Sequence, residues 1–544
     1  MESAIHHVNT RRLIAALSAG LAALVLWAAT AFAQGSTLRI AMTASDIPYT
    51  GGQADNGFEG LRFVGYQIYE PLVAWDLTQG EKLPSLVPGL AESWEPRKDN
   101  PMHWIIKLRK GVNFHDGSAF NADAVIFTLD SVKNKDAPQF DRLGAGNTGF
   151  RLTLFKSWKK VDDYTVDIET NRQSAWLPYQ MLYVMMVSPA NWEKTGKDWR
   201  KYAESPSGTG PFKVTRFVPR ERLELEANRA YWNPKRMPKV DKLILFPMPE
   251  PTTRLAALRS GQVDWIEVPP PDSIPQLRSG GFQIMLRTYP HNWGHTLRLD
   301  KAPWDNKLLR KAANYAIDRV GLCKALLNDT CVPGTGVVYK GHPWFGSPKE
   351  TYEYNPEKAK ELIRQAGYGD GKRPPKAVHL ISTSGSGQML PLPMNELIQK
   401  NLRDVGLDVD VQPVEWNSLL TRWRAGFGTP ENQGLNAWNI SLAFPDPYSA
   451  LARFFHSSSV VPVSVNTMPY VNKDVDKLIE GAEKSFDMKE QDRLLAKAHE
   501  IIVDDAPWIF AVHDLNPRAM SPKVKGFVQP QSWFVDLTSV SVTK

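Results

Sequence analysis

Few residues of this sequence have the types and spacing that catalysis or metal binding requires. His115 and Asp116 are adjacent and could act as an acid and base pair, and His291 and His295 are four residues apart, which on a helix would place two metal ligands on one face. The motifs of serine hydrolases, zinc proteases, phosphate-binding loops and thiol proteases do not occur. The sequence therefore predicts no catalytic site and no metal site, and an enzyme remains only as an alternative with an unrecognised site.

The elements around these residues favour structural roles for them. Pro290 and Gly294 interrupt any helix through the two histidines, so metal binding there is disfavoured. His115 and Asp116 fall in a loop between a predicted strand and a predicted helix.

The stretch from Gly89 to Val132 has the most consistent local signals of the chain. Leu90 to Trp94 and Trp104 to Leu108 flank a polar turn, and apolar and charged residues alternate in the second run, which predicts a half-buried hairpin. Asn121 then stands where an N-cap belongs, and the apolar residues that follow have helical spacing.

Further along, strands alternate with helices, and this pattern predicts a largely parallel sheet. One amphipathic helix is expected over Lys307 to Leu327, and the sequence from Val378 to Val411 predicts strand, loop, helix and strand. Ligands of such sheets bind beyond the carboxyl ends of the strands. The loop from Ser382 to Gln388 and the pair Glu415 and Trp416 are therefore expected in a cleft.

Composition is that of a soluble chain with two or three domains. The sequence has 544 residues, 42% of them hydrophobic and 23% charged, with a formal net charge of +7. The basic residues are spread along the chain, so no nucleic-acid partner is expected. The 18 tryptophans fit either core packing or a pocket that stacks flat groups.

Residues Met1 to Ala33 are predicted to be a secretory leader. Arg11 and Arg12 precede an apolar run that ends in Ala31, Phe32 and Ala33, a typical cleavage pattern. Cleavage near Ala33 would place the protein in the periplasm. A retained membrane anchor is the alternative, and the two arginines also match a twin-arginine signal weakly.

Cys323 and Cys331 are the only two cysteines of the sequence. Export to an oxidising compartment and their nearness in sequence favour a local disulfide. Two thiols alone cannot complete a zinc site.

Several segments resemble the extracytoplasmic solute-binding proteins of family 5, the peptide, opine and nickel receptors of ABC importers. The resemblance spans nearly all of the chain after the leader. The matching segments are residues 69–73, the stretch from Gly89 to Val132, and residues 207–212, 258–264, 309–319 and 504–508.

This resemblance implies an α/β fold of two lobes, a periplasmic binding protein of the type II clamshell class with an additional subdomain inserted in the first lobe. It predicts a leader at 1–33, the first lobe at 34–75, 206–289 and 513–544, the inserted subdomain at 76–205, and the second lobe at 290–512.

The function implied is a receptor that captures a peptide or peptide-like solute and delivers it to a permease and its ATPase by hinge closure. Because the ATPase subunits carry out the chemistry of transport, the resemblance implies that this chain needs no cofactor. The protein is expected to act as a monomer. A receptor for an opine-like or oligosaccharide solute is the alternative within the same fold, and an envelope chaperone or a chemoreceptor ligand carrier would differ only in its partner.

The ligand-binding residues are predicted from this placement and from side-chain chemistry. The loop from Thr43 to Gly60 is either a cleft loop or a surface loop, and a cleft loop would contribute Asp46 and Tyr49. The full set predicted is Asp46, Tyr49, Trp293, Ser384, Ser386, Gln388, Glu415, Trp416, Trp438, Phe444 and Asp446.

The resemblance also indicates which solutes to expect. Dipeptide receptors of the family carry an aspartate for the ligand ammonium where this sequence has Ala443, and an arginine for the ligand carboxylate in the loop that here runs from Ile381 to Leu390 and has no Lys or Arg. A longer or capped peptide, an opine-like conjugate or a small glycoside is therefore predicted in preference to a free dipeptide. If this placement is a few residues off, Asp446 is the candidate for the ammonium.

Overall fold

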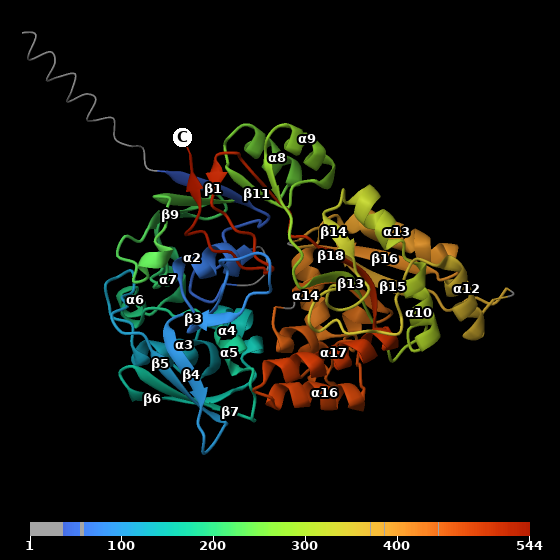
Figure 1. Ribbon diagram of the computed structural model, residues 1–544, viewed down its shortest axis with the longest axis horizontal. Coiled ribbons are helices and arrows are strands. Elements are labelled where there is room, and N and C mark those ends of the chain that lie inside the picture. The colour runs from blue at the N-terminus through green and yellow to red at the C-terminus, as the bar shows by residue number, and fades with distance from the viewer. Residues whose placement is uncertain (1–35, 55–58, 370, 386, 444, 544) are drawn as a thin grey trace, which may run out of the picture.

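The molecule, a computed structural model, has two lobes that lie side by side (Figure 1). Residues of the N-terminal and C-terminal segments share the first lobe, on the left of the figure, and the C-terminus lies beside β1. The predicted leader lies outside the described residues. The structure describes residues 36–54, 59–369, 371–385, 387–443 and 445–543.

The first lobe is built on a mixed sheet with the order β12-β19-β11-β1-β10-β9-β8. The central strand β1 runs parallel to β10 and β11, and the outer pairings are antiparallel. Most residues of β1 are buried, as expected for a strand covered on both faces. The strands are β1 (Thr37–Met42), β8 (Phe212–Val218), β9 (Arg222–Ala227), β10 (Lys242–Pro247), β11 (Trp265–Glu267), β12 (Gln283–Met285) and β19 (Arg518–Met520).

A second, antiparallel sheet with the order β4-β5-β7-β6 lies at the lower left of Figure 1. The hairpin predicted between residues 90 and 108 is confirmed, and the side chain of Asn121 accepts a hydrogen bond from the N–H of Ala124 and so caps α3 (Ala122–Lys133). The strands are β4 (Ala91–Pro96), β5 (His103–Leu108), β6 (Phe155–Asp162) and β7 (Thr165–Thr170), and β2 (Val73–Trp75) pairs with β3 (Leu86–Pro88) beside them.

The sheet of the second lobe has the order β14-β18-β13-β17-β15-β16. Among the described strands of this sheet, the parallel pairings are those of β15 with β16 and β17, and the pairings of β13, β14 and β18 are antiparallel. The prediction of a largely parallel sheet was therefore wrong, because β13 and β18, which carry the chain into and out of this lobe, run antiparallel to each other and to their other neighbours. The strands are β13 (His291–Leu297), β14 (Cys331–Pro333), β15 (Ala377–Ser382), β16 (Val409–Val414), β17 (Ala437–Ala443) and β18 (Trp508–Asp514).

Helices cover both lobes, and among the described residues none has the length and apolar character that crossing a membrane requires. On the first lobe they are α2 (Tyr66–Ile68), α4 (Arg142–Thr148), α5 (Leu177–Met181), α6 (Pro189–Lys194), α7 (Trp199–Glu204), α8 (Pro251–Arg259) and α9 (Ile274–Ser279). On the second lobe they are α10 (Lys307–Ala316), α11 (Arg319–Gly321), α12 (Pro356–Gln365), α13 (Pro391–Asp404), α14 (Trp416–Ala425), α15 (Arg453–Phe455), α16 (Lys473–Lys484) and α17 (Met488–Asp505).

The helix predicted from Lys307 to Leu327 is broken after α10. Ile317 has extended backbone angles, and the side chain of Asp318 accepts a hydrogen bond of 2.8 Å from the N–H of Gly321, which starts a new turn. Val320, an apolar residue within the range of the predicted amphipathic helix, is consequently exposed. An N-cap aspartate within an apolar pattern was the signal of this break.

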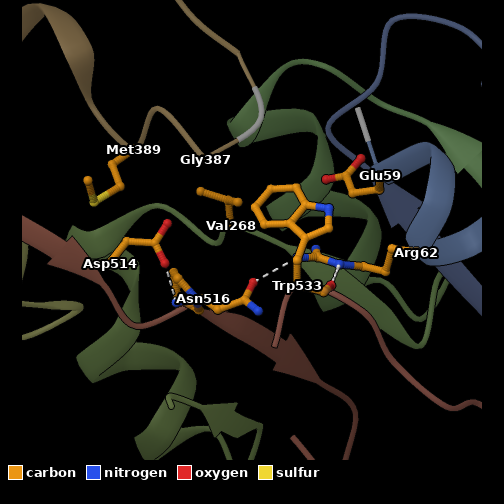
Figure 2. Close-up of a pocket in the computed structure, with 9 residues that line it drawn as sticks. Glu59, Arg62, Val268, Gly387, Met389, Asp514, Asn516 and Trp533 are labelled. Carbon is orange, nitrogen blue, oxygen red and sulfur yellow. Dashed lines mark hydrogen bonds between the residues drawn. The ribbon is translucent and has the colours of Figure 1, made fainter. Parts of the chain in front are cut away.

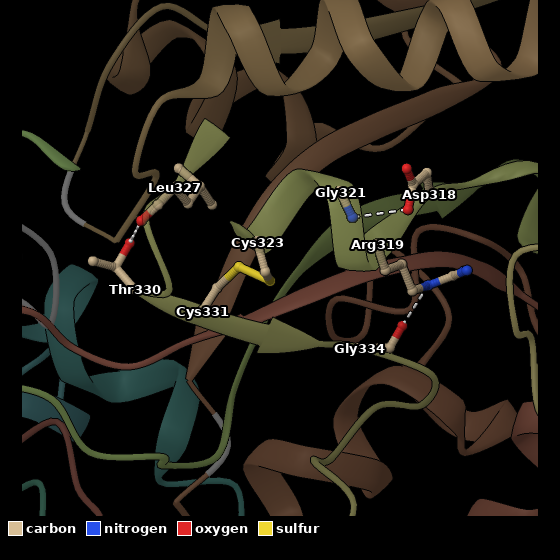
Figure 3. The surroundings of a disulfide bond; sticks show 8 residues. All are labelled: Asp318, Arg319, Gly321, Cys323, Leu327, Thr330, Cys331 and Gly334. Carbon is tan, nitrogen blue, oxygen red and sulfur yellow. Dashed lines mark hydrogen bonds between the residues drawn. A yellow bond between two sulfur atoms is a disulfide. The ribbon is translucent and has the colours of Figure 1, made fainter. Parts of the chain in front are cut away.

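A disulfide joins Cys323, in the π-helix η6 (Leu322–Leu326), to Cys331 at the start of β14 (Figure 3). The two cysteines are eight positions apart in the sequence, and the bond ties this helical segment to an edge strand of the sheet of the second lobe. Nearby, the hydroxyl of Thr330 donates to the carbonyl of Leu327, so the intervening turn is also closed by a hydrogen bond.

The chain crosses between the lobes twice, from β12 to β13 and from β18 to β19. A buried network of charged groups lies at these crossings. Glu267 is paired with both Arg62 and Arg518, and all three side chains are almost fully buried. Burying unpaired charge is costly, so this pairing requires β11, β19 and the π-helix η2 (Gly60–Gly65), which carry the three residues, to stay together.

Candidate functional site

A cavity of about 570 Å³ lies between the lobes and has walls from both. This volume falls within the range of about 300–1,000 Å³ that is typical of ligand sites. The first lobe contributes Lys133, Gly146, Asn147, Gly149, Phe150, Arg151, Thr153 and Trp533. The second lobe contributes His291, Trp416, Asn417, Leu420, Trp423, Arg424, residues 440–443, Arg453 and residues 462–465.

The wall from the second lobe is formed largely by α14. Glu415 caps this helix by accepting a hydrogen bond of 3.0 Å from the N–H of Ser418, which fixes where the helix begins. Trp416, Leu420 and Trp423 recur at helical spacing and therefore face the cavity from one side of α14. Their side chains give this wall a broad apolar and aromatic surface.

The wall from the first lobe is formed by α4 and the residues after it. Asp141 caps α4 by accepting from the N–H of Leu143, and it also accepts a hydrogen bond of 2.7 Å from the hydroxyl of Tyr49. Asn147 donates to the carbonyl of Gln53, which anchors the end of the helix. This arrangement presents Phe150 and the segment around it to the cavity.

A buried polar cluster joins the lobes at the edge of the cavity. Tyr183 donates a hydrogen bond of 2.8 Å to Oδ2 of Asp446, and Oδ1 of Asp446 accepts from the N–H of Ser449. Arg151 donates to the hydroxyl of Ser449 at 3.3 Å, and Nε of Arg453 donates to its carbonyl at 3.2 Å. Burial and the charge of Asp446 raise the pKa of Tyr183 well above its ordinary value, so its hydroxyl keeps the proton that it donates.

The charged residues that line the cavity are all positive among the residues described there: Lys133, Arg151, Arg424 and Arg453. Burial lowers the pKa of Lys133, whose ammonium donates to the carbonyl of Leu152. Burial, and after it the charge of Arg151, lowers the pKa of Arg453 to about 10, so the guanidinium group of Arg453 remains charged at neutral pH.

Of the residues predicted to bind ligand, Trp416 lines this cavity and Asp446 lies within the adjoining cluster. Ala443 also lines it, at the place where the resemblance puts an aspartate in dipeptide receptors. Ser386 and Phe444 lie outside the described residues.

The other predicted residues have partners elsewhere. Trp293 is fully buried in the central strand β13, and Trp438 stacks on Phe427 with 4.6 Å between ring centroids. Gln388 is buried and donates to Ser441, while Ser384 and the helix cap Glu415 are exposed. Tyr49 is bonded to Asp141, and Asp46 accepts from the N–H of Arg220 on the first lobe.

Several residues of the cavity and of the adjoining polar cluster were not predicted from the sequence: Phe150, Arg151, Tyr183, Trp423, Arg453 and Trp533. Three of them belong to the segment between residues 76 and 205, whose pattern indicates a subdomain but not its contact with the second lobe. The sequence offered one usable signal, the spacing of Trp416 and Trp423 on a single helix.

A second, much smaller cavity of about 10 Å³ lies at the crossings between the lobes (Figure 2). Its volume is about that of one water molecule. Figure 2 shows Trp533 between Glu59 and the segment of Asp514 and Asn516, with Arg62 donating to the carbonyl of Trp533. This space is too small for a solute.

The remaining chemistry-bearing residues have structural partners. His291 lies 3.1 Å from Asp514, and His295 contacts His379, so the two histidines of β13 do not converge. Across the described part of the chain, no group of three or more His, Cys, Asp or Glu is placed to hold a metal ion. His115 contacts the carbonyl of Gly210, and burial lowers its pKa to about 4.

Comparison with known proteins gives a consistent result. The family description of the bacterial extracellular solute-binding proteins, family 5, matches residues 85–461. Heme-binding protein A of Haemophilus influenzae is 28% identical over 495 residues, which cover 88% of this chain and 87% of that protein. The glutathione-binding protein GsiB of Pectobacterium atrosepticum is 29% identical over 550 residues and covers 97% of each chain.

The fold is that of solved two-lobed receptors. The periplasmic binding protein DppA of Helicobacter pylori, in complex with the peptide STSA, superposes with a TM-score of 0.78 at 24% identity, covering 94% of this chain and 98% of that one. The prediction of a two-lobed α/β clamshell fold is confirmed.

Proposed function

This chain belongs to the bacterial extracellular solute-binding proteins of family 5, and from that membership we propose that it captures a peptide-like solute in the cavity between its lobes and delivers it to an ABC permease with its ATPase. The members of this family are binding proteins, and we extend this to the chain itself, which performs no chemistry on its solute. The permease partner and a periplasmic location, reached after cleavage near Ala33, are parts of the same proposal.

The observation that carries the proposal is the position of the cavity. Its walls come from α4 and its neighbours on one lobe and from α14 and β17 on the other, so a solute bound there contacts both lobes at once. A ligand moves a two-state equilibrium only through its differential affinity for the two states, and a shift from 1:99 to 99:1 takes about 5.5 kcal/mol. A solute that touches both walls supplies such a difference, because the open form offers it only one wall.

The walls favour a conjugated or capped peptide over a free dipeptide. A free dipeptide needs an acidic partner for its ammonium, and the corresponding wall position is Ala443. Trp416, Trp423 and Phe150 offer aromatic faces to apolar or flat parts of a solute. The relatives named for glutathione and heme suggest glutathione as the first probe. An opine-like conjugate or a small glycoside remains the second candidate.

We propose the same division of the chain as the sequence predicts, with the first lobe at 34–75, 206–289 and 513–544, its inserted subdomain at 76–205 and the second lobe at 290–512. The pairing of β19 with β11 and β12 supports the return of the C-terminal segment to the first lobe. The ion pair of Arg236 with Asp536 supports it too.

The test is to purify the exported protein, identify the small molecule that it retains by native mass spectrometry, and measure its affinity by calorimetry beside glutathione and dialanine. A peptide-like solute is expected, with at least tenfold weaker binding in Trp416→Ala and near-normal binding in Trp416→Phe, which keeps an aromatic face. Tight binding of dialanine that is lost in Asp446→Ala would refute the solute assignment. Absence of any bound solute, with no response to either probe, would refute the receptor function.

A further inference from the structure

The two buried arginines of the cavity come from different lobes. Arg151 ends the short helical turn η3 (Gly149–Arg151) of the first lobe, and Arg453 begins α15 of the second. Their exposed fractions are 6% and 5%, and both line the cavity. Ser449 accepts one hydrogen bond from each of them, so the two side chains converge on one residue.

Neither arginine has a carboxylate partner within the described part of the chain. Asp446 is the acid that raises the pKa of Arg453, but among the described residues its carboxylate forms no ion pair with either guanidinium. Both oxygens of Asp446 are already engaged, by the hydroxyl of Tyr183 and the N–H of Ser449. The positive charges of Arg151 and Arg453 therefore face the cavity, and the carboxylate of Asp446 nearby is hydrogen-bonded to other groups.

Most of the donors of the two guanidinium groups remain available. A guanidinium has five N–H donors, and the hydrogen bonds described for Arg151 and Arg453 use one nitrogen of each. Several described side-chain nitrogens and oxygens are buried without a hydrogen-bond partner, but none of them belongs to Arg151 or Arg453. Since both residues line the cavity and are otherwise buried, these donors are open to it.

We propose that Arg151 and Arg453 form a carboxylate subsite that an anionic group of the solute bridges across the two lobes. This inference rests on the proposed function and adds the charge class of the solute: at least one carboxylate, held by donors from both walls. Planar guanidinium groups match a carboxylate with two parallel hydrogen bonds. The aromatic faces of Trp416 and Trp423 then receive the rest of the molecule.

The subsite also couples the solute's charge to closure. Without an anion, closing the lobes brings two desolvated positive charges together, which opposes the closed form. A carboxylate between Arg151 and Arg453 offsets the repulsion between their positive charges. The carboxylate can contact both arginines only when the lobes are closed, so it stabilises the closed form. A neutral analogue of the same shape therefore binds more weakly than its acid. Lys133 and Arg424 add positive potential to the same cavity and attract anions to it.

The experiment is calorimetry with the solute that the exported protein retains, as purified and after methyl esterification of its carboxylates. The wild type, Arg151→Gln, Arg453→Gln and the double variant are compared. Arg200→Gln is the control, because its exposed side chain lies in the first lobe away from the cavity. Each single variant is expected to lose at least about 30-fold in affinity. The double variant should lose less than the product of the two single losses, because both arginines hold one group.

Esterification tests the inference without any variant, so a failure of Arg151→Gln or Arg453→Gln to fold does not block it. The ester should bind the wild type at least about 30-fold more weakly than the acid. A retained solute with no acidic group, or equal affinity for acid and ester, overturns the carboxylate subsite and leaves the receptor function in place. A wild-type protein that retains and binds nothing overturns the receptor function and this inference with it.

Discussion

The hydroxyl of Tyr183 donates a hydrogen bond of 2.8 Å to Oδ2 of Asp446, and this bond joins the first lobe to the second. Both side chains are buried, so neither finds water as a substitute partner while the lobes are together. The bond therefore favours the arrangement in which the cavity is enclosed.

Changing Tyr183 to Phe should weaken solute binding by about tenfold to a hundredfold. The variant leaves one oxygen of a buried carboxylate unsatisfied, and hydrogen bonds to charged groups contribute about 1.5–3 kcal/mol. Tyr179→Phe is the matched control, because no hydrogen bond of its hydroxyl occurs among the described residues. Calorimetry with the retained solute measures both, and equal losses in the two variants would contradict the role of this bond.

Placing a carboxylate on the cavity wall should reverse its charge preference. Ala443→Asp adds an acid among Arg151, Arg453 and the other positive residues of the cavity. Affinity for an acidic solute is expected to fall by about tenfold or more, because the new aspartate competes for the same donors. Ala443→Asn, of similar size and without charge, separates this effect from steric exclusion. If both variants bind the acidic solute equally, charge is not the cause.

Acid should destabilise the protein between about pH 6.5 and 4, with His499 as one cause. Its Nε2 accepts hydrogen bonds from the N–H groups of Val337 and Val338, and Nδ1 contacts the carbonyl of Phe345, so the neutral ring is required. Burial lowers the pKa of His499 from 6.5 to about 4. As the pH falls, His499 therefore takes up a proton in the unfolded chain before it does so in the folded protein. Its contribution to the free energy of unfolding is fully present above pH 6.5 and is lost as the pH drops toward 4.

The loss of stability in acid follows from the difference between the pKa of His499 in the unfolded chain and in the folded protein. About 2.5 pKa units correspond to roughly 3 kcal/mol lost by pH 4 through this group alone. Urea unfolding at several pH values should give a smaller slope of unfolding free energy against pH for His499→Gln than for the wild type. Parallel slopes over this interval would show that His499 titrates normally.

The disulfide should resist alkylation in the exported protein. Cys323 and Cys331 are bonded to each other, so alkylation of unfolded but unreduced protein should label neither. Replacing both with serine is expected to lower the unfolding free energy by about 2–3 kcal/mol, because the closed loop is short. Solute affinity should change little, since neither cysteine lines the cavity. Free labelling without reductant would contradict the pairing in the exported protein.

The exported protein should begin near Gln34. Intact-mass measurement after periplasmic extraction reports the new terminus directly, and Ala33→Leu should block cleavage because the site needs a small residue. A chain that retains Met1 and stays with the membrane would support the anchor alternative.

Local structure was largely determined by the sequence itself. Asn121 and the apolar spacing after it defined α3, and alternation from Trp104 to Leu108 defined a strand, because caps and periodicity act over a few residues. The same local rules failed at Asp318, where a helix cap overrode an apolar stripe, and in the second sheet, where strand direction depends on partners far along the chain.

The cavity was decided by tertiary structure. Trp293 and Trp438 have the chemistry of ligand contacts, but packing in the sheet buries them, while Arg151 and Arg453 are brought together although 302 positions separate them in the sequence. Nothing in the residues near either arginine specifies the other, because the lobes that carry them meet only through long-range packing. The sequence thus determined which elements form and which family they belong to, and the meeting of two lobes determined which side chains line the cavity.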